Sequence, residues 1–185
     1  MPTPSDAVAT YILAKDNNRP FLMRHAFMQD ASLEMLVKTD TISFPSSAKG
    51  LTEIENVLIR RFGIDYENVY TVCLSRPTEA NLRHFPCHWL VGMSAKADGK
   101  VRVGCGRYDW FFSGAHHGLV EKLVITIDVM ESLPEVTLAP TMNWIAKLPY
   151  PWCTPEEAAK DMPRIEGFGR LGAFVKHSRP IAPDR

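Results

Sequence analysis

The 185-residue sequence lacks several features that would place it in a particular class of protein. No apolar run approaches the roughly 20 residues that a membrane-spanning helix needs. Neither sign of charge is in excess, because 21 basic and 21 acidic residues cancel, whereas nucleic-acid-binding domains usually carry a basic surplus. The start, MPTPSDAVAT, has no basic segment followed by an apolar one, as a secretory signal has. We therefore expect a cytoplasmic protein that binds neither membranes nor nucleic acid.

Metal and cofactor motifs are also missing. The pattern Gly104-Cys-Gly106 lies inside an apolar strand-like run, whereas a phosphate-binding loop connects a strand to a helix. His116 and His117 have no acidic or cysteine partner at a metal-ligand spacing. The cysteines are too widely spaced for a zinc or redox pair, and we expect buried free thiols. No metal and no cofactor is predicted. The four cysteines are Cys73, Cys87, Cys105 and Cys153.

The most informative stretch is residues 87–130, which holds three β-rich runs with no helix-length gap between them. Asp98-Gly99, between the first two runs, is typical of a tight β-hairpin, so antiparallel pairing is predicted. The middle run, 101–113, would extend roughly 43 Å, too long to stay flat in a small domain. Its two glycines are places where it can bend. A curved antiparallel sheet with a pocket on its concave side is therefore expected.

Three helices are predicted ahead of these strands. Ser5 is a candidate cap for a helix over 5–16, and Pro20 suits the first turn of a second, shorter helix. A Thr-x-x-Glu capping box at Thr52 predicts a third helix, which Gly63 would end. Strands are predicted in ASLEMLV and VYTVCL, on either side of the third helix. The apolar side of the first helix would carry Val8, Tyr11, Ile12 and Lys15.

The composition of the sequence changes after Leu133, because eight of the 14 prolines lie from Pro134 onward. We predict a core domain of residues 1–133 and an extension, 134–185, that packs on it. Short helices are expected near 141–147 and after Thr154, where TPEE forms a capping box. The tryptophans of the extension favour its packing across the sheet or the pocket mouth.

The order helix, helix, strand, helix, strand and three long strands resembles the nuclear transport factor 2-like superfamily, and in detail its SnoaL-like branch. The resemblance implies an α+β cone, in which N-terminal helices close over a curved antiparallel sheet, and commonly a homodimer through the sheet's outer face. Members include ketosteroid isomerase, dehydratases, polyketide cyclases and noncatalytic proteins, so the fold does not give the function. The resemblance rests on the residues Tyr11 and Asp16 and on the segments FMQDASLEM (27–35), AKGLTEIENVLIRRF (48–62) and GCGRYDWFF (104–112).

Two candidate site residues lie on the first helix. Tyr11 matches the pocket tyrosine of the isomerases and dehydratases, where a phenol donates a hydrogen bond to a substrate oxygen. It is equally consistent with an aromatic residue on a buried helix stripe. Asp16 matches an acid of the dehydratases, and the alternative is a solvated or capping carboxylate at the helix end.

Two more candidates lie in the strand block. Asp109 matches the position of a cavity acid of the isomerases, but Arg107 shares its strand face and favours a structural ion pair. The opposite face of that strand, with its aromatic residues, is the other candidate for the pocket lining. His88 is a candidate general base if its face points inward, and otherwise a surface or core histidine. Met35 stands where ketosteroid isomerases have their base, so that activity is not expected.

Two functional classes follow. The first is a cofactor-independent lyase, isomerase or cyclase acting on a small, apolar or cyclic molecule, with Tyr11 polarising an oxygen and Asp16, His88 or Asp109 moving a proton. The second is a noncatalytic ligand-binding protein or dimeric scaffold. A cavity that contains two or more of these four residues would favour the enzyme, and a cavity filled by Met, Phe and Trp would favour the second class. A small-molecule ligand and a homodimer are predicted.

Overall fold

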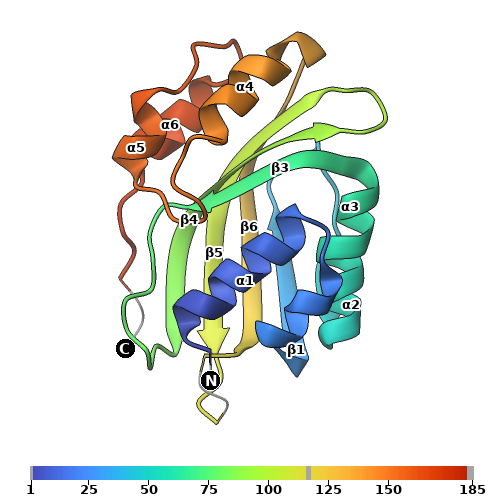
Figure 1. The fold of residues 1–185 in the computed structure, drawn as a ribbon, viewed down its shortest axis with the longest axis vertical. Helices are drawn as coiled ribbons and strands as arrows, with labels where there is room; N and C mark the ends of the chain where they lie inside the picture. The colour runs from blue at the N-terminus through green and yellow to red at the C-terminus, as the bar shows by residue number, and fades with distance from the viewer. Residues whose placement is uncertain (1, 116–117, 183–185) are drawn as a thin grey trace.

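The computed structural model describes residues 2–115 and 118–182. Their centre is one curved six-stranded sheet in the order β2-β1-β6-β5-β4-β3, with helices on its concave side and further helices near one end (Figure 1). This is the α+β cone that the sequence predicted. No described helix is long and apolar enough to cross a membrane. The strands are β1 (Phe27–Val37), β2 (Ser47–Lys49), β3 (Tyr66–Cys73), β4 (His84–Ala95), β5 (Val101–Phe112) and β6 (Val120–Leu133).

The three long strands pair antiparallel, as predicted, and Gly99 adopts a φ of +67° in the β4–β5 hairpin. Such a φ favours glycine, which explains the Asp-Gly signal. The β5–β6 register shifts between Cys105 and Gly106, so that Asp128 of β6 has no partner on β5. Bulges of this kind bend a sheet. The sheet is mixed, because β1 runs parallel to β6.

Two of the predicted helix boundaries were wrong. The first helix, α1 (Pro4–Asp16), is capped by Thr3 in a capping box with Asp6, because Ser5 already lies inside the first turn. After the 3₁₀ helix η1 (Pro20–His25), the third predicted helix begins after Gly50 without a side-chain cap, so the box at Thr52 does not form.

The third helix also continues beyond Gly63. It comprises α2 (Leu51–Glu55), a π-helical turn η2 (Asn56–Arg61) and α3 (Phe62–Asp65). A Cβ at Gly63 would lie 2.7 Å from the side chain of Asn18, which is closer than real Cβ contacts. The glycine therefore allows two segments to approach closely, and it does not end the helix.

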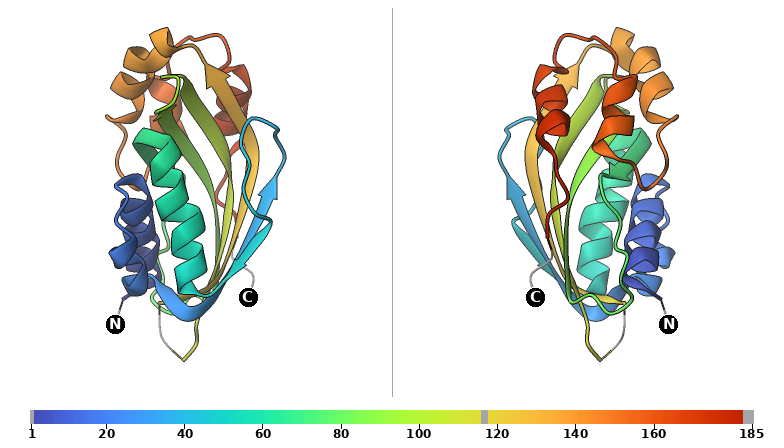
Figure 2. Two further views of the ribbon diagram at one scale, coloured as in Figure 1. Left: turned by 90° about the vertical axis from the view of Figure 1, so that its right-hand side faces the viewer. Right: turned by 90° about the vertical axis from the view of Figure 1, so that its left-hand side faces the viewer.

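The extension packs against the outer face of the sheet. Its elements are η3 (Glu135–Thr137), α4 (Leu138–Ile145), α5 (Pro155–Lys160) and α6 (Gly169–His177), of which α6 was not predicted. Thr154 caps α5 in the predicted capping box. Trp144 and Leu171 are buried there in a cluster of apolar side chains that includes Leu90 and Val103 of the strands, here called the outer cluster. Figure 2 shows these helices beside the end of the sheet that α1 does not cover.

Candidate functional site

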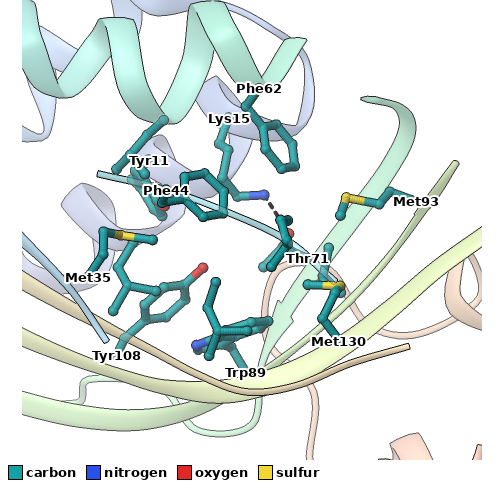
Figure 3. A pocket seen from close by; sticks show the side chains of 15 residues that line it. Tyr11, Lys15, Met35, Phe44, Phe62, Thr71, Trp89, Met93, Tyr108 and Met130 are labelled. Atoms are coloured by element: carbon teal, nitrogen blue, oxygen red, sulfur yellow. Dashed lines mark hydrogen bonds between the residues drawn. The ribbon is translucent and has the colours of Figure 1, made fainter. Parts of the chain in front are cut away.

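A cavity lies between α1, the helix of α2, η2 and α3, and the concave face of the sheet (Figure 3). The space open to the centre of a water molecule is about 50 Å³. This is about a third of the ~150 Å³ of an engineered cavity that binds benzene, so a ring-sized ligand fits only when the walls move apart. The walls are mostly apolar. They comprise Tyr11, Lys15, Met35, Ile42, Phe44, Leu58, Phe62, Thr71, Trp89, Val91, Met93, Tyr108, Ile125, Ile127 and Met130.

Helical spacing brings Tyr11 and Lys15 to the same wall, because residues four apart on a helix share a face. Figure 3 shows both opposite Trp89 and Tyr108 of the sheet. The Tyr11 hydroxyl is buried and has no hydrogen-bond partner among the described residues. The Tyr108 hydroxyl lies nearby and acts on the pKa of Tyr11 as a hydrogen-bonding neighbour does, but the two hydroxyls do not meet the distance and angle limits of a hydrogen bond. Burial raises the pKa of both phenols, so both remain protonated donors at neutral pH.

A buried ion pair lies at one end of this wall. The Lys15 Nζ atom donates to Asp16 Oδ1 at 2.6 Å and to Thr71 Oγ1 at 2.8 Å. Asp16 also accepts from the amide and hydroxyl of Thr71, at 2.7 and 2.9 Å, and from the Tyr150 hydroxyl at 3.1 Å. Burial raises the pKa of the Asp16 carboxyl, and the Lys15 ammonium and the Thr71 donors oppose that rise. Both oxygens of the carboxylate thus accept hydrogen bonds from neighbouring residues, and the carboxylate does not line the cavity.

The structure places the four predicted residues in two separate regions. Tyr11 lines the cavity, and Asp16 lies behind its wall, joined to it through Lys15. Asp109 and His88 were expected to reach the cavity if their strand faces pointed inward, and they do not, because both lie on the outer face. On β5 the aromatic residues Tyr108 and Trp110 face inward, so Asp109 between them must face outward.

On the outer face, Asp109 is held by two partners. Its Oδ1 atom lies 2.5 Å from Arg107 Nη2 and 3.0 Å from His84 Nε2. This confirms the ion pair of Arg107 and Asp109. His88 is half-buried, and its ring packs edge to face on Phe174 of α6 at 5.1 Å. Burial and the Arg107 guanidinium lower the pKa of His88.

The sequence analysis missed most of the polar cavity residues, although some signals were present. Lys15 stood on the same helix face as Tyr11, and it was interpreted only as part of a buried stripe. Tyr108 belongs to the aromatic face of β5 that was the other candidate for the lining, whereas Thr71 and Trp89 depend on the β3–β4 pairing, which a sequence does not show. Among the described residues, no cluster of three His, Cys, Asp or Glu side chains is placed to hold a metal ion.

No family model matches the sequence, and no curated protein matches it by sequence. Solved structures do match. An NTF2-like protein from Burkholderia thailandensis is 14% identical, with a TM-score of 0.53 over 71% of this chain and 92% of that one. A ketosteroid isomerase-like protein from Catenulispora acidiphila, solved with trimethylamine, is 14% identical, with a TM-score of 0.52 over 67% and 85%.

An LEH-like epoxide hydrolase from M. tuberculosis is also similar, at 11% identity and a TM-score of 0.50, over 68% of this chain and 82% of that chain. At such identities the likeness concerns the fold alone. These matches cover 67–71% of this chain, and the part that they leave uncovered is about as long as the extension. The helices over a curved sheet, the cavity between them and these matches together assign to this chain the nuclear transport factor 2-like fold.

Proposed function

We propose that the protein binds a compact, mainly apolar small molecule that presents one hydrogen-bond acceptor, such as a ketone oxygen, inside the cavity. The observation that carries this proposal is the Tyr11 hydroxyl, which is buried in an apolar cavity without a partner. Leaving such a donor unpaired costs about 1–3 kcal/mol, which an acceptor on a ligand would recover. The free space of about 50 Å³ limits the ligand to a compact molecule, and a single ring requires the walls to move apart.

The charges in the cavity favour a neutral ligand. Lys15 is the one charged residue among the described lining residues, and the Asp16 carboxylate at 2.6 Å already neutralises it. An anionic ligand would therefore lose its hydration without meeting an unpaired cation. The sheet side, with Trp89 and Tyr108, offers flat aromatic surfaces, and three methionines among the lining residues allow the walls to adjust to the ligand.

Binding without catalysis is the function favoured here. Of the four residues predicted to act in catalysis, only Tyr11 lines the cavity, and Met, Phe and Trp side chains provide six of the fifteen lining residues. A cofactor-independent isomerase or lyase is the second candidate, and the Lys15–Asp16 pair favours it, because a proton could pass between cavity and carboxylate through Lys15. Deuterium exchange at the methyl group of a bound aryl methyl ketone, lost in Asp16→Asn, would support this second candidate.

The direct test is the affinity for 4-fluoroacetophenone, a neutral aromatic ketone, measured by fluorine NMR titration. Tyr11→Phe should weaken binding by about 0.5–1.5 kcal/mol, or roughly 2- to 12-fold in Kd, because one neutral hydrogen bond is lost. Tyr70→Phe is the matched control, since Tyr70 packs against the outer cluster. Equal affinity of the wild type and Tyr11→Phe would contradict the proposal, and so would absence of binding at millimolar ketone.

Three further parts of the proposal rest on the sequence. Membership of the SnoaL-like branch, assembly as a homodimer and a cytoplasmic location are predictions from the resemblance and from composition. The division into a core domain, 1–133, and an extension, 134–185, is likewise a proposal. It is supported by the separate cluster of apolar side chains through which the extension packs on the sheet.

A further inference from the structure

The buried cavity needs a route to solvent, and one wall differs from the others. Among the described residues that line the cavity, Phe44 alone is partly exposed, and the rest are buried. Phe44 lies in the loop that connects β1 to β2. Figure 2 shows this loop opposite the helix of α2, η2 and α3, on the side turned toward the viewer in its left view.

A surface pocket lies directly outside this wall. It measures about 330 Å³ and runs between the loop and the helix, from Thr41 to Tyr66. Ile42, Phe44 and Phe62 line both this pocket and the cavity. Three side chains therefore form a partition one residue thick between the cavity and solvent.

Hydrogen bonds attach this loop at two points, and between them Ile42 and Phe44 hold it only by packing on apolar side chains of the core. On one side the Thr41 hydroxyl donates to the Met130 carbonyl at 2.5 Å, and on the other the Met35 amide donates to the Ser46 carbonyl at 2.9 Å. Residues 42–45, here called the strap, make no backbone–backbone hydrogen bond with any residue that the structure describes. Segments held by few backbone hydrogen bonds open at low cost in free energy.

There is also room for the strap to move. The 330 Å³ pocket borders it, and a second surface pocket of about 390 Å³ adjoins the first, because Pro45, Val57 and Arg61 line both. The helix that faces the strap contains the π-helical turn η2, a feature that often marks functional sites. Leu58 of that turn points to the cavity, whereas Val57 and Arg61 line the outer pocket.

We infer that the strap is the gate of the cavity and that Phe44 is the residue that controls passage of ligand between the cavity and solvent. This inference rests on the proposed function for the ligand, and on the structure alone for the route. When the strap swings outward about Thr41 and Ser46, the Phe44 ring leaves the partition and joins the cavity to the outer pocket. Phe44 then sets how fast a ligand exchanges more than how tightly it binds.

The first test needs no ligand. The Trp89 indole N–H is buried and unpaired, so its exchange with deuterated water reports solvent access to the cavity region. Phe44→Ala should speed this exchange by about tenfold or more, because the partition opens more often. The Trp144 indole N–H, bonded to the Ala158 carbonyl at 3.0 Å in the outer cluster, is the internal control and should not change. Ser43→Ala is the control variant, since Ser43 lines only the outer pocket.

The second test measures the exchange rate of 4-fluoroacetophenone by fluorine NMR. Phe44→Ala should raise the association rate by about tenfold, because removal of a gate speeds entry, whereas the mere loss of a wall contact would speed dissociation alone. Phe44→Leu, a smaller change that preserves an apolar contact, should give an intermediate rate. Circular dichroism on each variant checks that the fold is kept.

The outcomes separate the two proposals. Unchanged Trp89 exchange in Phe44→Ala, or an equal effect of Ser43→Ala, would overturn the gate even if the ketone binds through Tyr11. Faster Trp89 exchange with no ketone binding would support the gate and overturn the proposed ligand. Faster Trp89 exchange with an unchanged association rate of the ketone in Phe44→Ala would also contradict the gate, because Phe44 would then act on binding only as a wall residue.

Discussion

Two neighbouring residues at the end of α1 have different tasks. Lys15 lines the cavity, whereas Asp16 lies behind the wall and holds the ammonium, the Thr71 hydroxyl and the Tyr150 hydroxyl in place. Because a helix rotates about 100° per residue, adjacent side chains do not share a face. Lys15 therefore faces the cavity while Asp16 lies behind the wall, and their ion pair connects the two sides. Asp16 is therefore a positioning residue for Lys15.

Removal of the Asp16 carboxylate should destabilise the fold. Asp16→Ala leaves the buried Lys15 ammonium without its counter-charge, and breaking a buried pair in this way typically costs 3–5 kcal/mol, so we expect a loss of about 3–5 kcal/mol in the free energy of unfolding. Asp30→Ala, at an exposed strand position, should change it by less than about 0.5 kcal/mol. Urea denaturation measures the free energy of unfolding of both variants. If Asp16→Ala lost as little as Asp30→Ala, the Lys15–Asp16 pair would not contribute to the stability of the fold.

His88 gives the fold a pH dependence with a definite sign. Burial and Arg107 lower its pKa below the ordinary value of 6.5, so below that pH the unfolded chain takes up a proton that the folded chain resists. Stability should therefore fall as pH decreases from 6.5 toward the folded pKa. Melting temperatures at about pH 7.5 and about pH 5.5 should differ less in His88→Gln than in the wild type. An identical difference would show that His88 does not contribute.

At the scale of elements, some local signals predicted the structure and others did not. The Asp98-Gly99 turn, the capping box at Thr154 and the buried apolar side of the first helix are all present. The caps predicted at Ser5 and Thr52 do not form, because each helix begins before the predicted residue. The inward face of β5 could not be predicted in the same way. Its first half, with Val103, is apolar on the outside because the extension covers it, whereas its second half is apolar on the inside.

The cavity was the least predictable part of the molecule. Its polar residues come from α1, β3, β4 and β5, and only the pairing of these elements brings Thr71 and Trp89 opposite Tyr11. The strap has no pattern of its own in the sequence, since SFPSSAKG simply indicates a turn. Its importance follows from Phe44 lying over the cavity, which is a property of the tertiary structure.

The helix α6 contributes a test of the outer cluster. Leu171 is fully buried against this cluster, and Leu171→Ala should lower the free energy of unfolding by about 2–5 kcal/mol, through lost burial and a residual cavity. Val136→Ala, at a side chain that is 83% exposed, is the matched control and should have little effect. If both substitutions had the same small effect, the extension would not be part of the folded core.

At the scale of the whole molecule, two apolar clusters lie on opposite faces of one sheet. The inner cluster surrounds the cavity, and the outer cluster joins the extension to the sheet. The strands thus separate a binding side from a side that stabilises the sheet. The extension covers part of the outer face that the resemblance assigns to a dimer interface, so the predicted homodimer would have to use the part that remains free.

The central claim is that the cavity holds a small molecule through the Tyr11 hydroxyl, and a crystal structure with bound 4-fluoroacetophenone tests it most directly. We predict ligand density between α1 and β5, with the ketone oxygen within about 2.5–3.0 Å of Tyr11 Oη, the range of O–H···O hydrogen bonds. The ring should lie against Trp89 or Tyr108. Density for the ketone only outside the cavity, or inside it with the oxygen directed away from Tyr11, would contradict the account.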